Sequence, residues 1–163
     1  AYRLKRLNFF LNRPMKGGGL QRWNQIRFAK REAGRFEKPI HEEFQFSCPA
    51  QDVGELKQKI WHLNDESYRE RMRKSDQYSL MVANEQAGCQ RLGWLRLIWR
   101  PIRTFVRSYL LLGGLRDGIP GLIWAQHSAS AELRIEILRW DRCNAIGREA
   151  VEKGVADSFS QNE

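Results

Sequence analysis

The sequence predicts an α/β fold in which short strands come first and helices follow. Within the first 64 residues, short runs rich in aromatic and aliphatic side chains are separated by Gly, Pro and Asn, which is typical of strands and turns. Beyond residue 64 the apolar residues recur at the helical period over longer segments. With 163 residues, of which 42% are hydrophobic, the chain is long enough to bury a core.

The strands are expected in the first 64 residues, followed by a helical region over residues 65–140 and a polar, frayed tail over residues 141–163. The runs that predict strands are residues 2–10, 22–30, 40–46 and 56–63. A loop that contains Gly17, Gly18 and Gly19 separates the first two.

Three helices are expected in the second region. The first runs to about residue 86 and is capped by Asn64 or Asp65. The second covers residues 94–112, with a kink or restart at Pro101. The third begins near Pro120 and ends near residue 140.

The chain is strongly basic, with 28 Lys and Arg against 19 Asp and Glu, a net charge of +9. This balance favours an anionic partner: a phosphate-bearing substrate, an acidic lipid surface or nucleic acid. Composition alone does not choose among these three classes.

The second helix is predicted to be amphipathic and basic. Four arginines fall on one narrow stripe at about 100° per residue, namely Arg96, Arg100, Arg103 and Arg107. Aliphatic and aromatic residues occupy the opposite side, and residues 91–116 contain no acid. Such a helix can lie in a membrane interface. Alternatively, it packs its apolar face on the core and leaves the arginines in solvent. The uncharged runs, residues 108–115 and 118–131, are too short to span a bilayer.

The three cysteines, Cys48, Cys89 and Cys143, lie far apart and form no Cys-x-x-Cys pair. This spacing predicts reduced thiols in a cytosolic protein. The chain has no signal peptide and opens directly in a strand-like run, so we expect it to be a fragment of a longer protein.

Candidate chemistry lies in three places in the first third of the chain. Glu42 follows His41, and a carboxylate beside a histidine can act as a general base. The loop of Lys16 and Gly18 could bring backbone N–H groups and an ammonium against a phosphate. Arg27, together with Lys30, Arg31 and Arg35, could bind a diphosphate. The alternatives are a polar loop at His41 and Glu42, a flexible connector at the glycines and scattered surface charge at Arg27.

The order of these signals resembles the C-terminal half of a family 2 glycosyltransferase, of the group that adds sugars to lipopolysaccharide cores. The resemblance covers roughly residues 1–140 and no single motif decides it. Its landmarks are the glycine loop with Trp23 after it, Ile26-Arg27-Phe28, Ile40-His41-Glu42, Ile60-Trp61-His62, Lys74 with Tyr78, and Gly113-Gly114 followed by Asp117-Gly118.

The resemblance implies the C-terminal part of a GT-A type fold and inverting transfer of a sugar from a nucleotide-diphosphate donor to a cell-envelope glycan or lipid-linked acceptor. By position, Glu42 would deprotonate the acceptor hydroxyl beside His41. Trp23 could stack on an acceptor sugar ring or pack in the core, and Arg27, Lys16 and Gly18 are the further candidate substrate contacts. The resemblance also implies a divalent metal, Mg or Mn, held by an Asp-x-Asp motif. This chain lacks that motif, so we assign it no metal ligand and expect no activity from it alone.

The resemblance further implies a cytoplasmic enzyme, peripheral on the inner membrane, in which the arginine stripe faces the membrane. Two alternatives come from other classes. A nucleic-acid-binding module would explain the basic charge, but no recognised motif supports it and nucleic acid is not expected as a partner. A non-catalytic membrane-surface adaptor is supported by residues 91–116 alone.

Overall fold

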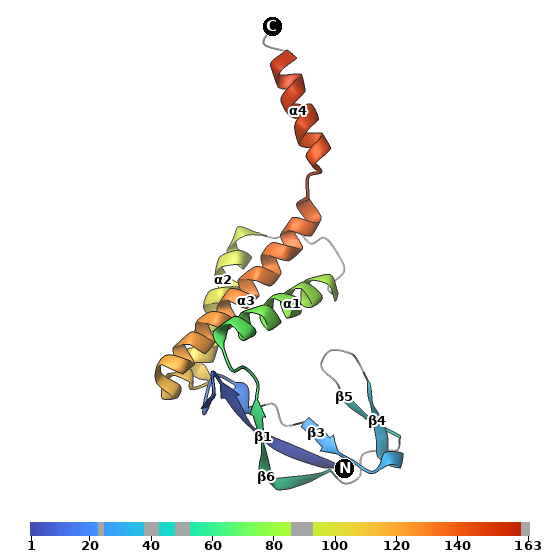
Figure 1. Ribbon diagram of the computed structural model, residues 1–163, viewed down its shortest axis with the longest axis vertical. Helices are drawn as coiled ribbons and strands as arrows, with labels where there is room; N and C mark the ends of the chain where they lie inside the picture. The colour runs from blue at the N-terminus through green and yellow to red at the C-terminus, as the bar shows by residue number, and fades with distance from the viewer. Residues whose placement is uncertain (23–24, 38–42, 48–52, 86–92, 161–163) are drawn as a thin grey trace.

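A computed structural model describes residues 1–22, 25–37, 43–47, 53–85 and 93–160. Strands fill the first part of the chain and helices the second, which confirms the α/β prediction at that level (Figure 1). The α3 helix lies between α1 and α2, and the sheet lies at one end of this helical layer.

The larger sheet is mixed and is centred on β1 (Tyr2–Phe10). The predicted final strand is present and slightly longer than expected, as β6 (Gly54–Leu63), and it pairs parallel to β1. The antiparallel partners of β1 are β2 (Arg13–Pro14) and β3 (Gln25–Phe28). Among the described residues β6 pairs with β1 alone, so its other edge is open. Trp61 of β6 is exposed, and its ring centroid lies 5.9 Å from that of Phe9 on β1.

A separate two-stranded sheet follows, formed by β4 (Gly34–Glu37) and β5 (Glu43–Phe46). Phe36, Phe44 and Phe46 meet edge to face, with ring centroids 5.2 and 5.1 Å apart. The strand predicted over residues 22–30 is shorter than expected. The preceding Leu20–Arg22 is a 3-10 turn, and Arg31–Ala33 forms another.

The first helix, α1 (Tyr68–Glu85), begins later than the sequence predicted. The cap is Ser67, not Asn64 or Asp65, because the Ser67 hydroxyl accepts the N–H of Glu70 at 3.2 Å. The Glu70 carboxylate in turn accepts the N–H of Glu66 at 3.0 Å. This reciprocal arrangement is close to a capping box, and it leaves the Asp65 side chain for other contacts.

The second helix, α2 (Trp94–Val106), is continuous through Pro101, so the predicted alternative of a helix restart there is wrong. Ion pairs from Arg96 and Arg100 to α3 hold the turns before the proline. The departure from α geometry comes later, in a π-helical segment, Arg107–Leu111.

A 3-10 turn, Gly114–Asp117, leads into α3 (Gly118–Asn144), the longest helix. Contacts with α1 fix α3 on one side: Arg134 pairs with Asp76 at 2.7 Å, and Arg142 donates to the carbonyl of Ala83 at 2.9 Å. The expected frayed tail is wrong, because α4 (Arg148–Ser160) forms there and points away from the remaining elements (Figure 1). An Arg148–Glu152 ion pair one turn apart supports it.

The expectation of reduced thiols is also contradicted, because Cys143 is disulfide-bonded. The other two cysteines, Cys48 and Cys89, lie outside the described residues. A disulfide between distant cysteines leaves no mark in their spacing, which is why the sequence pattern did not predict it.

The buried apolar core of the described residues is small. Its members are Phe10, Met15, Ala83, Ala125, Ala129 and Ile135. Many large apolar side chains are exposed instead, on β6, α2 and the turn that leads into α3. Large exposed apolar patches mark surfaces that another molecule covers.

Candidate functional site

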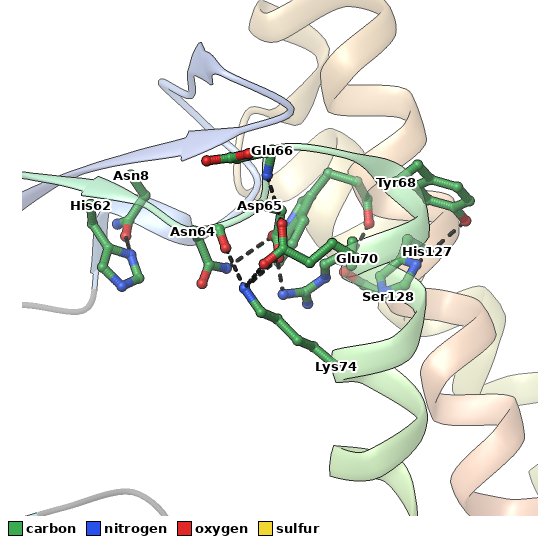
Figure 2. A network of polar contacts seen from close by, with 12 residues as sticks. Asn8, His62, Asn64, Asp65, Glu66, Tyr68, Glu70, Lys74, His127 and Ser128 are labelled. Carbon is green, nitrogen blue, oxygen red and sulfur yellow. Dashed lines mark hydrogen bonds and ion pairs between the residues drawn. The ribbon is translucent and has the colours of Figure 1, made fainter.

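A polar constellation lies where the β1–β6 pair ends against the helical layer (Figure 1). His62 on β6 sits opposite Asn8 on β1 in the parallel register, and its Nδ1 lies 2.9 Å from the Asn8 Oδ1 (Figure 2). The Asn8 Nδ2 donates to the carbonyl of Leu20, which orients the amide so that Oδ1 faces the histidine. His62 Nδ1 therefore carries the proton, and Nε2 keeps a lone pair.

The surroundings of His62 are cationic. Partial burial lowers the pKa of His62 most, and the charges of Arg6, Lys74 and Arg27 lower it further, against the opposing effect of Asp65. The ring is therefore neutral at pH 7. A neutral imidazole nitrogen in a positive field can accept a proton from a hydroxyl or lie beside an anionic group.

Next to His62, a buried carboxylate organises the start of α1. The Asp65 side chain is 0% exposed and lies 3.5 Å from the Arg71 Nη1 and 3.6 Å from the Lys74 Nζ (Figure 2). Lys74 also donates to the carbonyl of Asn64 at 2.6 Å and pairs with Glu70 at 2.7 Å. This network fixes the Lys74 ammonium between β6 and α1, close to His62.

An aromatic group extends this network into α3. His127 is buried, its Nδ1 lies 3.4 Å from the Tyr68 hydroxyl, and its ring stacks on Trp124 with centroids 6.5 Å apart. The guanidinium of Arg71 lies over the Trp124 ring at 4.7 Å. Burial, followed by the charge of Arg71, lowers the pKa of His127 to about 4. His127 is therefore a neutral packing residue at pH 7.

The glycine loop packs against the turn before α3. Asp117 accepts the backbone N–H groups of Lys16 and Gly17 at 2.8 and 2.7 Å. The N–H of Gly18 donates to the carbonyl of Leu112 at 3.0 Å, and the Gly18 carbonyl accepts the Trp124 Nε1 at 3.1 Å. These backbone N–H groups already donate hydrogen bonds within the protein, so they are not available to bind a phosphate.

Only glycine fits at the centre of this loop. A Cβ on Gly17 would lie 2.1 Å from the carbonyl oxygen of Gly113, and one on Gly18 would lie 2.7 Å from the Trp124 ring. Gly18 also has a φ of +68°, which side-chain-bearing residues rarely adopt. The loop therefore joins sheet and helices, and only the exposed Lys16 side chain still points to solvent.

Several predicted site residues lie outside the described residues: the His41–Glu42 pair and Trp23. In sequence, His41 and Glu42 come directly before β5, whose first residue is Glu43. The guanidinium of Arg27, on β3, stacks on the Phe36 ring at 5.7 Å and acts electrostatically on His62. Arg27 is therefore a predicted substrate-binding residue whose charge acts on the His62 constellation.

The arginine stripe of α2 divides into two pairs. Arg96 and Arg100 face α3, where both pair with Glu136, whose side chain is 0% exposed. Arg100 also pairs with Glu132 at 3.4 Å, and Arg139 of α3 contacts Glu136 at 3.3 Å. Arg103 and Arg107 lie further along the helix and are exposed. The predicted membrane-facing role of Arg96 and Arg100 conflicts with this geometry, because both are turned toward a buried carboxylate.

Sequence reasoning missed Asn8, Asp65, Arg71 and Glu136 as organising residues. Asn8, Arg71 and Glu136 act through partners distant in the sequence, such as His62, which is 54 residues from Asn8. Asp65 acts through Arg71 and Lys74, which lie nearby on α1. The residues that the structure describes contain no group of three His, Cys, Asp or Glu side chains that could hold a metal ion. Over the same residues, no helix is long and apolar enough to cross a membrane.

Comparison of this chain with protein-family models, with curated proteins and with solved structures finds no match. The function is therefore inferred from the residues and their geometry.

Proposed function

We propose that this chain is the acceptor-side part of a membrane-peripheral, inverting glycosyltransferase. It would act on a nucleotide-diphosphate sugar and transfer the sugar to a cell-envelope glycan or lipid-linked acceptor. The supporting observation is the neutral His62 in its cationic surroundings at the end of the β1–β6 pair. Such a field suits the diphosphate of a sugar nucleotide.

The packing of distant landmarks adds support. The glycine loop, His62, Lys74 and the Gly113–Asp117 turn come from the two halves of the sequence. The glycine loop is hydrogen-bonded to the turn through Asp117, and Lys74 pairs with Asp65 next to His62. The open edge of β6 is suited to pairing with a further strand, as a donor-binding half would supply.

In the proposed reaction Glu42 removes the proton from the acceptor hydroxyl. That oxygen bonds to the anomeric carbon from the face opposite the donor's carbon–oxygen bond, which breaks as its electron pair passes to the diphosphate. The positive field around His62 stabilises the charge that develops on the leaving group. The metal that the resemblance implies has no ligand cluster among the described residues, so we assign it no step here.

We place the enzyme on the cytoplasmic face of the inner membrane, where a lipid-linked acceptor is available. The support is the exposed apolar surface of α2. The same surface favours a second candidate, a membrane-surface adaptor without catalysis. Neither candidate explains the Cys143 disulfide, which is unusual in a cytosolic protein.

The test compares Glu42→Gln with Glu43→Gln in the natural gene product that contains this chain. Sugar transfer is followed with labelled nucleotide sugars and an envelope extract as acceptor. Loss of a general base costs about 10²- to 10⁴-fold in turnover, so Glu42→Gln should lose that much while still binding the donor. Glu43→Gln should stay within a few-fold of the unmodified protein. Equal activity of all three proteins would exclude Glu42 as the base, and absence of transfer in all three would favour the adaptor.

A further inference from the structure

The α2 helix turns its apolar face outward. Trp94 and Trp99 are 69% and 64% exposed. The other large apolar side chains of this face are Leu95, Ile98, Ile102 and Val106, and all are exposed as well. An ordinary surface helix buries this face and exposes its charges, so the orientation of α2 is the reverse of the usual one.

The cause of this orientation lies on α3. Arg96 and Arg100 are drawn inward by Glu136, which has no exposed side-chain surface, and Arg100 is shared with Glu132. A buried carboxylate is tolerated only when it is paired, so these contacts determine which side of α2 faces α3. The apolar side is thereby left on the surface. The fold thus presents this surface through specific ion pairs.

The remaining two arginines line the border of the apolar face. Arg103 and Arg107 line a small hollow together with Arg100, Thr104 and the carboxylate of Glu132, where three guanidinium groups outnumber one acid. The same two arginines also line an apolar groove, whose other members are Trp99, Ile102, Val106 and Leu111. A cationic rim therefore adjoins an apolar floor.

Exposed apolar side chains continue in the chain beyond α2. They are Leu110 and Leu111 in the π-helical segment, Leu115 in the 3-10 turn and Ile119 at the start of α3. Residues 91–116 carry no acidic side chain, and the acid that lines the hollow at the rim is Glu132 of α3. Together these residues define one patch, the α2 apolar face with its Arg103–Arg107 rim.

We propose that the α2 apolar face docks on an anionic phospholipid bilayer. The helix lies in the plane of the interface, the two tryptophans and neighbouring aliphatic residues enter the acyl boundary, and Arg103 and Arg107 contact lipid phosphates. This inference rests on the peripheral location proposed above, and it names the surface responsible. A second copy of the chain fits less well, because a symmetric contact through this patch would bring the arginine rims of two +9 chains together.

The test is sedimentation of the full chain with large unilamellar vesicles of phosphatidylcholine containing 30 mol% phosphatidylglycerol, which needs neither donor nor acceptor. The double variant W99E/I102E should lose at least 100-fold in partitioning. R103Q/R107Q should lose about 30-fold, since each basic residue near the surface contributes about 1 kcal/mol. Circular dichroism checks that each variant is folded.

The matched control is R69Q/R73Q. It removes two exposed arginines with the same four-residue spacing, but from α1. It should lose far less binding than R103Q/R107Q. An equal loss would mean that only net charge acts and would overturn the proposal. Vesicle binding that survives W99E/I102E would overturn it as well. The proposal would also be overturned if the chain did not bind vesicles and instead used Trp99 to associate with a second copy or with a donor-binding half. A protein that binds vesicles but transfers no sugar would contradict the proposed glycosyltransferase and leave the membrane-docking proposal intact. The two proposals can therefore be tested separately.

Discussion

Removing the charge of Glu136 tests the structural basis of the outward-facing α2. Glu136 is the one acid that contacts three arginines in the described residues, namely Arg96, Arg100 and Arg139, and its side chain is 0% exposed. Glu136→Gln keeps the shape of the side chain but leaves the guanidinium groups without their carboxylate. We therefore expect α2 to lose its anchorage on α3.

The magnitude follows from burial. Breaking a buried ion pair by removing one partner costs about 3–5 kcal/mol. The charge left in a poorly solvated place is that of Arg139, whose side chain is 9% exposed, whereas Arg96 and Arg100 are 35% and 32% exposed. The matched control is Glu132→Gln, one turn earlier on α3. Glu132 is 30% exposed and pairs with Arg100 alone, so this change should cost at most about 1 kcal/mol.

Urea unfolding followed by circular dichroism, with thermal melting alongside, measures both variants. For a chain of this size 1 kcal/mol shifts the melting temperature by about 2–4 °C, so Glu136→Gln should melt about 6–20 °C lower and Glu132→Gln at most about 4 °C lower. Similar losses in the two variants would refute the reasoning that Glu136 is the anchor of α2.

Two further outcomes follow from the site. Asp117→Asn removes one of the two hydrogen bonds that this side chain accepts from the glycine loop, and it should lower the free energy of urea unfolding by about 1.5–3 kcal/mol. The control, Asp157→Asn on exposed α4, should change that free energy by less than about 0.5 kcal/mol. Equal effects of the two changes would contradict the role of the loop in joining sheet and helices. The folded pKa of His127 is about 4, below its ordinary 6.5, so the stability it contributes is complete above pH 6.5 and is lost as the pH falls toward 4. Through His127 alone, the free energy of unfolding should be about 2 kcal/mol lower at pH 5 than at pH 7.5, and His127→Phe should abolish this contribution. If the variant kept the same dependence of stability on pH, the effect would belong to other groups.

Local signals predicted most of the elements. Strands over residues 2–10 and 56–63 and the positions of three helices were confirmed with shifted ends, because alternation and helical periodicity are properties of short segments. The helix cap was missed although its signal was present. Ser67 followed three residues later by Glu70 is a recognisable capping box, and it competed with the neighbouring Asn64 and Asp65.

Long-range pairing could not be predicted in the same way. Periodicity identified the arginine stripe of α2 correctly but not the direction in which it faces, because that depends on Glu132 and Glu136, more than 30 residues later. Likewise, the composition of the glycine loop suggested a phosphate site, whereas Asp117, about 100 residues away, takes its N–H groups. A lysine-containing glycine loop has the same local appearance whether a phosphate or a carboxylate accepts its hydrogen bonds.

The His62 constellation was not predicted as a site. His62 and Lys74 were landmarks of the resemblance and not predicted site residues, and the structure brings them close together through Asp65 and Asn64. Asn8 fixes the tautomer of His62, but a single asparagine within a strand-like run gives no sequence pattern from which this role could be predicted. The assignment of Glu42 as base stays a prediction, since it lies outside the described residues.

The central claim, that this chain is the acceptor-side part of a glycosyltransferase, is tested most directly by reading the natural coding frame ahead of Ala1. The proposal predicts roughly one further domain of alternating strands and helices, on the usual scale of 100–150 residues, that carries an Asp-x-Asp motif. A start codon next to Ala1 with no such segment would contradict the enzyme and leave the α2 apolar face as the functional surface.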